Sequence, residues 1–172
     1  MEKTNRYALW LMPEGIVYAR AYAIIKHLHK RFDSPKFEPH ITLLSGIEMS
    51  EDNAIWHAEK LNDEINSIPI RLTKPAYGND YYHCFFLNAD LSQPLVSARQ
   101  KALSLFETPD STPFEPHMSL LYGDIDLPIK KSLVEEYGHL QRWEFIVDHI
   151  DLVRTGDDIE EWDKVGSYSI KS

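Results

Sequence analysis

The sequence contains a single cysteine, Cys84, among its 172 residues. One thiol precludes an intrachain disulfide, and scarcity of cysteine is typical of proteins from a reducing compartment. Cys84 stands between His83 and Phe85 in a strand-like segment, so we expect it to be a small buried hydrophobic residue rather than a catalytic thiol. The cysteine content therefore predicts a cytoplasmic protein.

Long apolar runs are also missing, because no segment approaches the ~20 residues that a membrane-spanning helix requires. The N-terminal residues 1–6 lead directly into strand-like sequence, without the apolar stretch or cleavage site of a secretory leader. We therefore expect no membrane association. With 43% hydrophobic and 26% charged residues, the composition is that of a globular chain. Its length suits one bilobal domain, residues 1–172, and we expect a monomer.

Positive charge is scarce: 18 Lys and Arg residues stand against 27 Asp and Glu residues, a formal net charge of −9. Such a surface repels the backbone of long nucleic acids, whose binding depends on contacts from Lys and Arg. Extended DNA or RNA is therefore disfavoured as a partner. A small phosphorylated nucleotide, or the cyclic-phosphate end of an RNA, needs only a local site and remains compatible with the acidic surface.

A short motif occurs twice in this chain, which has no low-complexity segment. Phe37–Leu44 and Phe114–Leu121 share the string Phe-Glu-Pro-His, continue with an apolar residue, a hydroxyl residue and a Leu pair, and each is followed by a glycine, Gly46 or Gly123. Such duplication suggests two related halves. A single His-x-Thr would carry little weight, but a purely structural duplication gives no reason for the histidine and the hydroxyl to recur together.

Both copies are short apolar segments bounded by Pro and Gly, which predicts strands. Because side chains alternate between the faces of a strand, His40 and Thr42 share one face, and so do His117 and Ser119. If the two copies pack about a pseudo-twofold axis, both imidazoles and both hydroxyls converge on one cleft. Facing imidazoles suit acid–base catalysis near neutral pH, and paired hydroxyls can hold the oxygens of a phosphate.

The hydrophobic periodicity predicts helices and strands in a repeated order. Helices are expected at 16–32, 50–66, 92–106 and 127–137, and strands at 7–12, 40–44, 68–76, 81–88, 117–121, 143–155 and 162–170. Turns at 78–80 and 156–158 imply hairpins, and hence antiparallel pairing. The predicted fold is α+β and bilobal: two pseudo-twofold-related antiparallel sheets flanked by helices, with a cleft between the lobes. The internal repeat would cover about 6–77 and 81–155, and the last strand would be an addition.

The strings Pro-His-Ile-Thr and Pro-His-Met-Ser resemble the paired motifs of the 2H phosphoesterase superfamily, which is defined by two His-x-Thr/Ser motifs. Within it, the chain looks most like the small cyclic phosphodiesterases that open 2′,3′-cyclic nucleotides or ADP-ribose 1″,2″-cyclic phosphate. The similarity covers most of the chain. It includes Trp10 and Pro13 in the first strand and an acidic turn between Thr155 and Trp162.

This resemblance implies that His40 and His117 are the catalytic acid–base pair, and that Thr42 and Ser119 bind the phosphoryl oxygens. One histidine would take a proton from water while the other protonates the departing ribose oxygen, which leaves a 2′-phosphate. The two motifs are nearly equivalent, so the sequence does not distinguish base from acid. No metal and no cofactor are expected.

Two aromatic residues outside the motifs are further candidates for substrate binding. By the resemblance, Trp10 contacts the base or the ribose, although burial in the core is an equal alternative for it. Tyr122 matches a position that lines the cleft, whereas strand alternation turns it away from Ser119 unless the strand ends or bulges there. Neither motif contains Arg or Lys, and Lys36 and Arg154 are candidates for extra positive charge by position alone.

Three other interpretations stay open at this point. An RNA-end-processing or 2′-5′ RNA ligase-like enzyme would keep the superfamily but change the reaction, and the acidic surface argues against it. A non-catalytic nucleotide-binding module would keep the cleft, and the intact motifs argue against it. A metallohydrolase lacks a carboxylate at ligand spacing from either motif histidine. The remaining histidines have no such partners either and are expected to be structural: His27, His29, His57, His83, His139 and His149.

Overall fold

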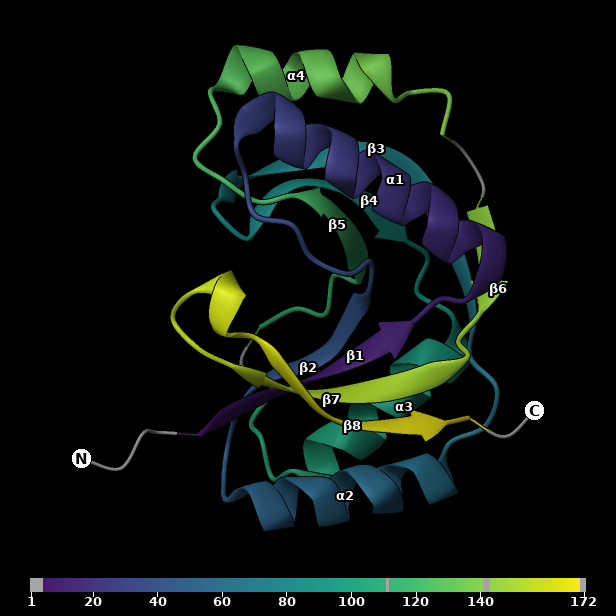
Figure 1. Cartoon of the computed structure of the whole chain (residues 1–172). Helices are drawn as coiled ribbons and strands as arrows, with labels where there is room; N and C mark the ends of the chain where they lie inside the picture. Colours follow the sequence, from purple (N-terminus) through teal and green to yellow (C-terminus); the bar gives the residue numbers. More distant parts are fainter. Residues whose placement is uncertain (1–4, 111, 141–142, 171–172) are drawn as a thin grey trace.

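The computed structural model describes residues 5–110, 112–140 and 143–170 (Figure 1). Residues 1–4, for which the sequence predicts no leader, lie outside this part. The helices are α1 (Gly15–Phe32), α2 (Glu51–Glu64), α3 (Gln93–Leu105), α4 (Leu127–Glu136) and the short 3-10 helix η1 (Ile159–Glu161). The strands are β1 (Arg6–Met12), β2 (Ile41–Glu48), β3 (Pro69–Asp80), β4 (His83–Ala89), β5 (His117–Leu121), β6 (Trp143–Ile146), β7 (His149–Thr155) and β8 (Asp163–Ser169). Within the described residues, no helix has the length and apolar character needed to cross a membrane.

The strands form one antiparallel sheet in the order β6-β3-β4-β5-β2-β1-β7-β8, so the predicted α+β class with antiparallel pairing is confirmed. The two expected sheets are its two four-stranded halves. They are joined between β5 and β2 by one residue pair, Ile41 with Met118. Figure 1 shows α1 and α4 covering the half that contains β5, and α2 and α3 covering the half that contains β2. The two motif strands therefore meet in the middle of the molecule.

The predicted strand at 143–155 is wrong as a single element, because it divides into β6 and β7 in opposite halves of the sheet. The division follows from a change of hydrogen-bond partner between consecutive residues. The N–H of Val147 donates to the carbonyl of Ile68 in one half, and the N–H of Asp148 donates to the carbonyl of Met12 in the other. The segment 143–155 has no Gly or Pro to mark this crossing, and its polar residues at the division, Asp148 and His149, are also compatible with one continuous strand.

The predicted turn at 78–80 is also misplaced, because β3 continues to Asp80 and the chain reverses at Tyr81 and Tyr82. Gly78 is needed here for close approach rather than for the turn itself. A Cβ on Gly78 would lie 2.3 Å from the backbone oxygen of His83, which no real side chain tolerates. The shifted turn places Tyr82 beside the motif strands.

Strand β1 is buried on both faces, which explains its apolar sequence. Tyr7, Leu9 and Leu11 have no exposed surface and belong to the main core, while Trp10 and its neighbours Ala8 and Met12 form a smaller cluster on the other face. Cys84 is fully buried in the main core, as predicted. Helix α2 begins as predicted after Ser50, whose hydroxyl accepts a hydrogen bond from the N–H of Asn53.

Candidate functional site

The two motif strands meet through equivalent residues. Ile41 and Met118, each the residue after its motif histidine, are paired across the β2–β5 junction and are fully buried. In antiparallel strands this register places His40 opposite Ser119 and Thr42 opposite His117. Each histidine thus lies beside the hydroxyl of the other copy, on the face away from the main core. A local twofold axis relates the two copies at this junction.

The structure brings all six predicted site residues to one cavity of about 530 Å³: Trp10, His40, Thr42, His117, Ser119 and Tyr122. The remaining lining comes from β1, β2, the β3–β4 turn, the end of β7 and the β7–β8 connection, namely Arg6, Ala8, Ser45, Tyr82, Thr155, Gly156, Asp157 and Trp162. A cavity of similar volume, about 510 Å³, lies against β3 and β6 and contains no histidine. The chemistry-bearing residues therefore point to the first cavity.

Both imidazoles are held in the same way. Nδ1 of His40 lies 2.7 Å from the backbone oxygen of Glu38, and Nδ1 of His117 lies 2.9 Å from that of Glu115. A carbonyl oxygen can only accept a hydrogen bond, so Nδ1 carries the hydrogen in each ring. In the neutral rings, Nε2 is then the unprotonated nitrogen. The shared geometry of the two copies equips both histidines to exchange a proton at Nε2.

Burial favours the neutral form of both rings, because a charged imidazolium loses its hydration inside the protein. It lowers the pKa of His40 to about 4, although the hydrogen bond to Glu38 and the charge of Asp151 oppose the shift. Burial also lowers the pKa of His117, with a further contribution from His83, whose ring centroid lies 4.6 Å away. A bound phosphate anion would raise these pKa values, since a nearby negative charge favours the imidazolium.

Trp10 is both a buried residue and a wall of the cavity. Only 6% of it is exposed, and its ring lies nearly parallel to the ring of His40, at a centroid distance of 3.7 Å and an interplanar angle of 10°. The stacked indole prevents the imidazole of His40 from tilting. The sequence predicts either burial in the core or a place in the cleft for Trp10, and in the structure Trp10 is buried and also lines the cavity.

Tyr122 reaches the cavity because the pairing of β4 with β5 shifts register between Ser119 and Leu121, so Leu120 and Leu121 both lie in the main core and Tyr122 falls on the side of Ser119. The residue is 4% exposed and packs on the ring of Phe37 at 4.1 Å. Burial raises the pKa of Tyr122, and a hydrogen bond with Ser119 opposes this rise. The phenol therefore stays protonated near neutral pH and can donate a hydrogen bond into the cavity.

The sequence did not single out Tyr82 and Trp162 as site residues, yet both line the cavity. Trp162 packs edge-on against Trp10 at 5.2 Å, and Tyr82 lies nearly parallel to Trp162 at 6.2 Å. The hydroxyl of Tyr82 donates to the backbone oxygen of Asp157, which ties the β3–β4 turn to the β7–β8 connection. In the sequence, the feature that could have indicated Tyr82 and Trp162 is that each is an aromatic residue close to a predicted turn.

The two cations proposed by position do not line the cavity. Lys36 lines a smaller neighbouring cavity of about 190 Å³, and Arg154 is paired with Glu51 and Asp163. Arg6, whose Nε lies 3.3 Å from Glu48, is the basic residue among those that line the site. The described residues also contain no group of three or more His, Cys, Asp or Glu side chains placed to hold a metal ion.

Comparison with known proteins gives a consistent result. Residues 6–170 match the model of the family described as cyclic phosphodiesterase-like protein. A cyclic phosphodiesterase of Arabidopsis thaliana is 24% identical over 170 residues, which are 95% of this chain and 94% of that protein. TT0787 of Thermus thermophilus has a TM-score of 0.70 at 15% identity and covers 96% of this chain and 97% of its own. LigT of E. coli in its apo form has a TM-score of 0.66 at 12% identity and covers 99% and 100%.

Proposed function

The chain belongs to the cyclic phosphodiesterase-like family of the 2H phosphoesterase superfamily and is a phosphodiesterase, and on this premise we propose that it hydrolyses a ribose cyclic phosphate. The substrate would be a 2′,3′-cyclic nucleotide or ADP-ribose 1″,2″-cyclic phosphate. The observation that carries the proposal is the matched pair of imidazoles on one cavity. Both hold their hydrogen at Nδ1 against a carbonyl and have Nε2 available, with a hydroxyl of the other motif beside each.

In the proposed reaction, one histidine accepts a proton from water as its oxygen attacks phosphorus in line. The bond between phosphorus and the ribose oxygen on the far side breaks, and the second histidine gives that oxygen a proton. Thr42 and Ser119 donate hydrogen bonds to the phosphoryl oxygens, where negative charge accumulates, and the phenol of Tyr122 adds a third donor. After the product leaves, the two histidines return to their starting protonation states by exchange with solvent.

The dimensions and walls of the cavity support a nucleotide-sized substrate. A volume of about 530 Å³ lies within the range of small-molecule sites, and the rings of Trp10, Tyr82 and Trp162 offer surfaces on which a base can stack. Crystal structures of the related E. coli LigT contain 3′-AMP, ATP or NADP+. The net charge of −9 supports a small substrate over an RNA end. A cytoplasmic monomer acting in RNA metabolism is part of this proposal.

The mechanism draws its proton transfers from side chains and uses no cofactor. The groups that face the cavity from the two motifs are imidazoles and hydroxyls, and the described residues hold no set of three or more His, Cys, Asp or Glu side chains placed to bind a metal ion. We expect turnover to continue in excess chelator. Activity that is abolished by EDTA and restored by a divalent ion would overturn the two-histidine mechanism.

A substrate panel followed by phosphorus NMR tests the function. The panel holds 2′,3′-cyclic nucleotides, an oligonucleotide ending in a cyclic phosphate, and ADP-ribose 1″,2″-cyclic phosphate, with the His40→Ala/His117→Ala double variant as the blank. In-line attack in a cleft with one histidine on each side releases a single isomer, and we expect the 2′-phosphate. A mixture of 2′- and 3′-phosphates would contradict the two-sided cleft. Binding without turnover across the panel would instead identify a nucleotide-binding module.

A further inference from the structure

The two identical Phe-Glu-Pro-His strings differ in what holds their glutamates. One carboxylate oxygen of Glu38 accepts a hydrogen bond from the hydroxyl of Tyr18 on α1 at 3.0 Å, and the other lies 3.5 Å from Nζ of Lys164 on β8. Burial, followed by the hydrogen bond to Glu38, raises the pKa of Tyr18 to about 12, so its hydroxyl remains a donor. Glu115 is exposed, and its carboxylate makes no hydrogen bond or ion pair within the described part of the chain.

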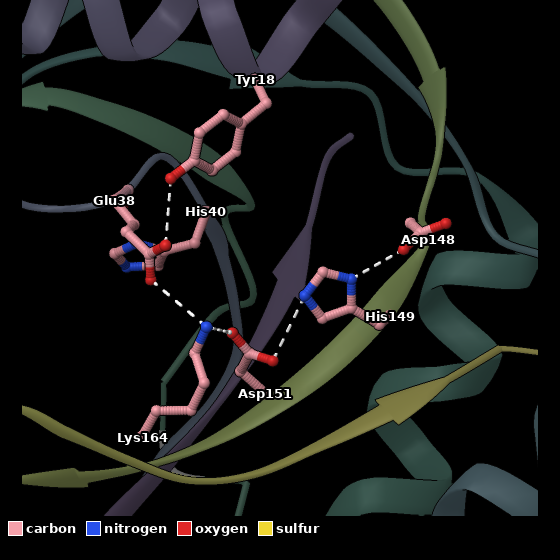
Figure 2. Close-up of polar contacts among 7 residues, drawn as sticks. All are labelled: Tyr18, Glu38, His40, Asp148, His149, Asp151 and Lys164. Carbon is pink, nitrogen blue, oxygen red and sulfur yellow. Dashed lines mark hydrogen bonds and ion pairs between the residues drawn. The ribbon is translucent and has the colours of Figure 1, made fainter. Parts of the chain in front are cut away.

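Lys164 connects Glu38 to a buried carboxylate, as Figure 2 shows. Asp151 on β7 is fully buried, with Nζ of Lys164 at 2.9 Å from one oxygen and Nε2 of His149 at 3.3 Å from the other. Neither oxygen of Asp151 has a hydrogen-bond partner among the described residues, and the ammonium of Lys164 is the positive charge that faces the buried carboxylate. Burial acts to lower the pKa of Lys164, but Asp151 and Glu38 raise it overall, which keeps the ammonium charged.

This network ends at two supports of His40. The backbone oxygen of Glu38 accepts the Nδ1–H of His40, and Asp151 is the cross-strand partner of Trp10, whose indole stacks on the same imidazole. Lys164 thus couples the residue that sets the tautomer of His40 to the strand that sets its ring plane. His117 has the matching carbonyl contact, but its glutamate lacks the anchors on α1 and β8.

We propose that Lys164, bridging Glu38 and Asp151, is a positioning residue for His40, and that this makes the two motif histidines non-equivalent in the reaction. The inference rests on the proposed function for its kinetic consequences, but not for its effect on the imidazole. The carbonyl that fixes the tautomer of His40 belongs to an anchored glutamate, whereas the matching carbonyl at His117 belongs to a glutamate whose side chain has no such anchors in the described part of the chain.

The titratable and charged groups near His40 lie on β5, β7, β8 and the segment before β2. Asp151 raises the pKa of His40 and His117 lowers it, while Lys164 lies between Asp151 and Glu38 and offsets their negative charge. Without Lys164, Asp151 would keep only the contact with the imidazole of His149, and its negative charge would act more strongly on His40, which favours the imidazolium. Loss of Lys164 should therefore raise the pKa of His40.

The repeat supplies a matched pair of variants. Glu38→Ala removes the anchored carboxylate, and Glu115→Ala removes its unanchored equivalent from the same string. Nitrogen-15 NMR of the imidazoles in the ligand-free protein reports which ring nitrogen carries hydrogen. We expect Glu38→Ala to mix the two tautomers of His40 and to leave His117 unchanged. Glu115→Ala should leave the Nδ1–H tautomer of both rings intact. Equal effects of the two variants, or an unchanged His40 in Glu38→Ala, would overturn the inference.

Kinetics at each variant's pH optimum give the second readout. Misplacing a proton-transfer group costs kcat more than KM, so we expect Glu38→Ala to lose about 10- to 100-fold in kcat with KM within about twofold. Glu115→Ala should keep kcat within about twofold. Lys164→Met should raise the pKa of His40 in the NMR titration. Lys164→Arg retains the positive charge, so both the pKa of His40 and kcat should stay near the wild-type values. Equal pKa values in Lys164→Met and wild type would contradict the role of Lys164.

A milder variant covers the case in which Glu38→Ala fails to fold. Tyr18→Phe removes one anchor of Glu38 while leaving its ion pair, and a smaller change at His40 is expected in the same direction. No change at His40 in a folded Tyr18→Phe would count against the positioning role. If the substrate panel shows no turnover, the NMR arm still decides the inference. If the panel shows turnover but the variants leave the imidazole of His40 unchanged in NMR, the positioning role of Lys164 is wrong and the proposed function stands.

Discussion

His40 shows how strongly its surroundings alter one side chain. It is 5% exposed, is covered by the ring of Trp10 and donates through Nδ1 to a backbone carbonyl. These contacts suit a neutral imidazole, and a proton added at Nε2 would be partly removed from water. The same residue is therefore a candidate proton-transfer group and a source of pH-dependent stability.

The first prediction concerns that stability. Burial lowers the pKa of His40 from 6.5 to about 4, so its contribution is fully present above about pH 6.5 and is lost as the pH falls toward 4. The shift corresponds to about 3 kcal/mol of unfolding free energy. Urea unfolding measures this at about pH 7 and about pH 4. Between these two pH values, the free energy of unfolding of wild type should fall by about 3 kcal/mol more than that of His40→Gln. Exposed His27→Gln should behave as wild type, and parallel pH dependences for wild type and His40→Gln would show that His40 titrates normally.

The second prediction separates proton transfer from phosphate binding. His40→Ala and His117→Ala should each lower kcat by about 10²- to 10⁴-fold, because each removes a proton-transfer partner. Thr42→Ala and Ser119→Ala should each cost about 1–3 kcal/mol of transition-state stabilisation, as lost hydrogen bonds to a charged group. Steady-state kinetics with His27→Ala as the control checks this. Near-full activity in either motif-histidine variant would refute the assigned roles.

At the scale of elements, β2 has to serve both the cavity and the core, and a bulge allows this. His40 and Thr42 line the cavity while Leu43 lies in the core, but Ser45 again lines the cavity, and the pairing with β1 shifts register at this point. Gly46 has a φ of 68°, in the left-handed region that favours glycine, and the strand then returns Ile47 to the core. The glycine after the first motif thus has a backbone role.

The third prediction follows from that backbone conformation. No atom lies within 4 Å of a Cβ placed on Gly46, so substitution is opposed by its positive φ and not by crowding. Gly46→Ala should lower the free energy of unfolding by about 1 kcal/mol, and Gly46→Asn by less, since Asn tolerates the left-handed region. Urea midpoints of the two variants measure the difference. An alanine variant as stable as wild type would mean that the bulge is not strained by a side chain.

At the scale of the whole molecule, the acidic surface and the local character of the site act together. The formal net charge is −9, and the cavity lining contributes one arginine, Arg6, which is itself beside Glu48. A small substrate meets mainly the imidazoles and hydroxyls, whereas a long polyanion also meets the rest of the surface. Discrimination by substrate length should therefore depend on salt.

The fourth prediction tests this. Raising salt from about 0.01 to about 0.15 M shortens the Debye length from about 30 Å to about 8 Å and screens the repulsion. The kcat/KM for a long oligonucleotide ending in a cyclic phosphate should rise over this range, while that for a cyclic mononucleotide changes little. A rate on the oligonucleotide that falls with salt would indicate a basic track for RNA and would favour the RNA-end interpretation.

Local sequence was sufficient for the parts of this protein that depend on strand periodicity. The duplicated string and the alternation of side chains placed His40 with Thr42, and His117 with Ser119, on one face of each strand, and the structure gathers all four on one cavity. The positions of most helices follow in the same way, because capping by Ser50 and the spacing of apolar residues are short-range features.

Tertiary contacts were needed wherever the outcome depends on partners distant in the chain. The predicted strand at 143–155 divides because Val147 and Asp148 donate to carbonyls in opposite halves of the sheet, which no local pattern encodes. Tyr82 and Trp162 reach the cavity through the packing of two connections. The identical strings around Glu38 and Glu115 acquire different surroundings because α1 and β8 pass over the first of them. Periodicity determines the face on which a side chain lies, whereas the neighbours that alter its pKa and its freedom come from long-range packing.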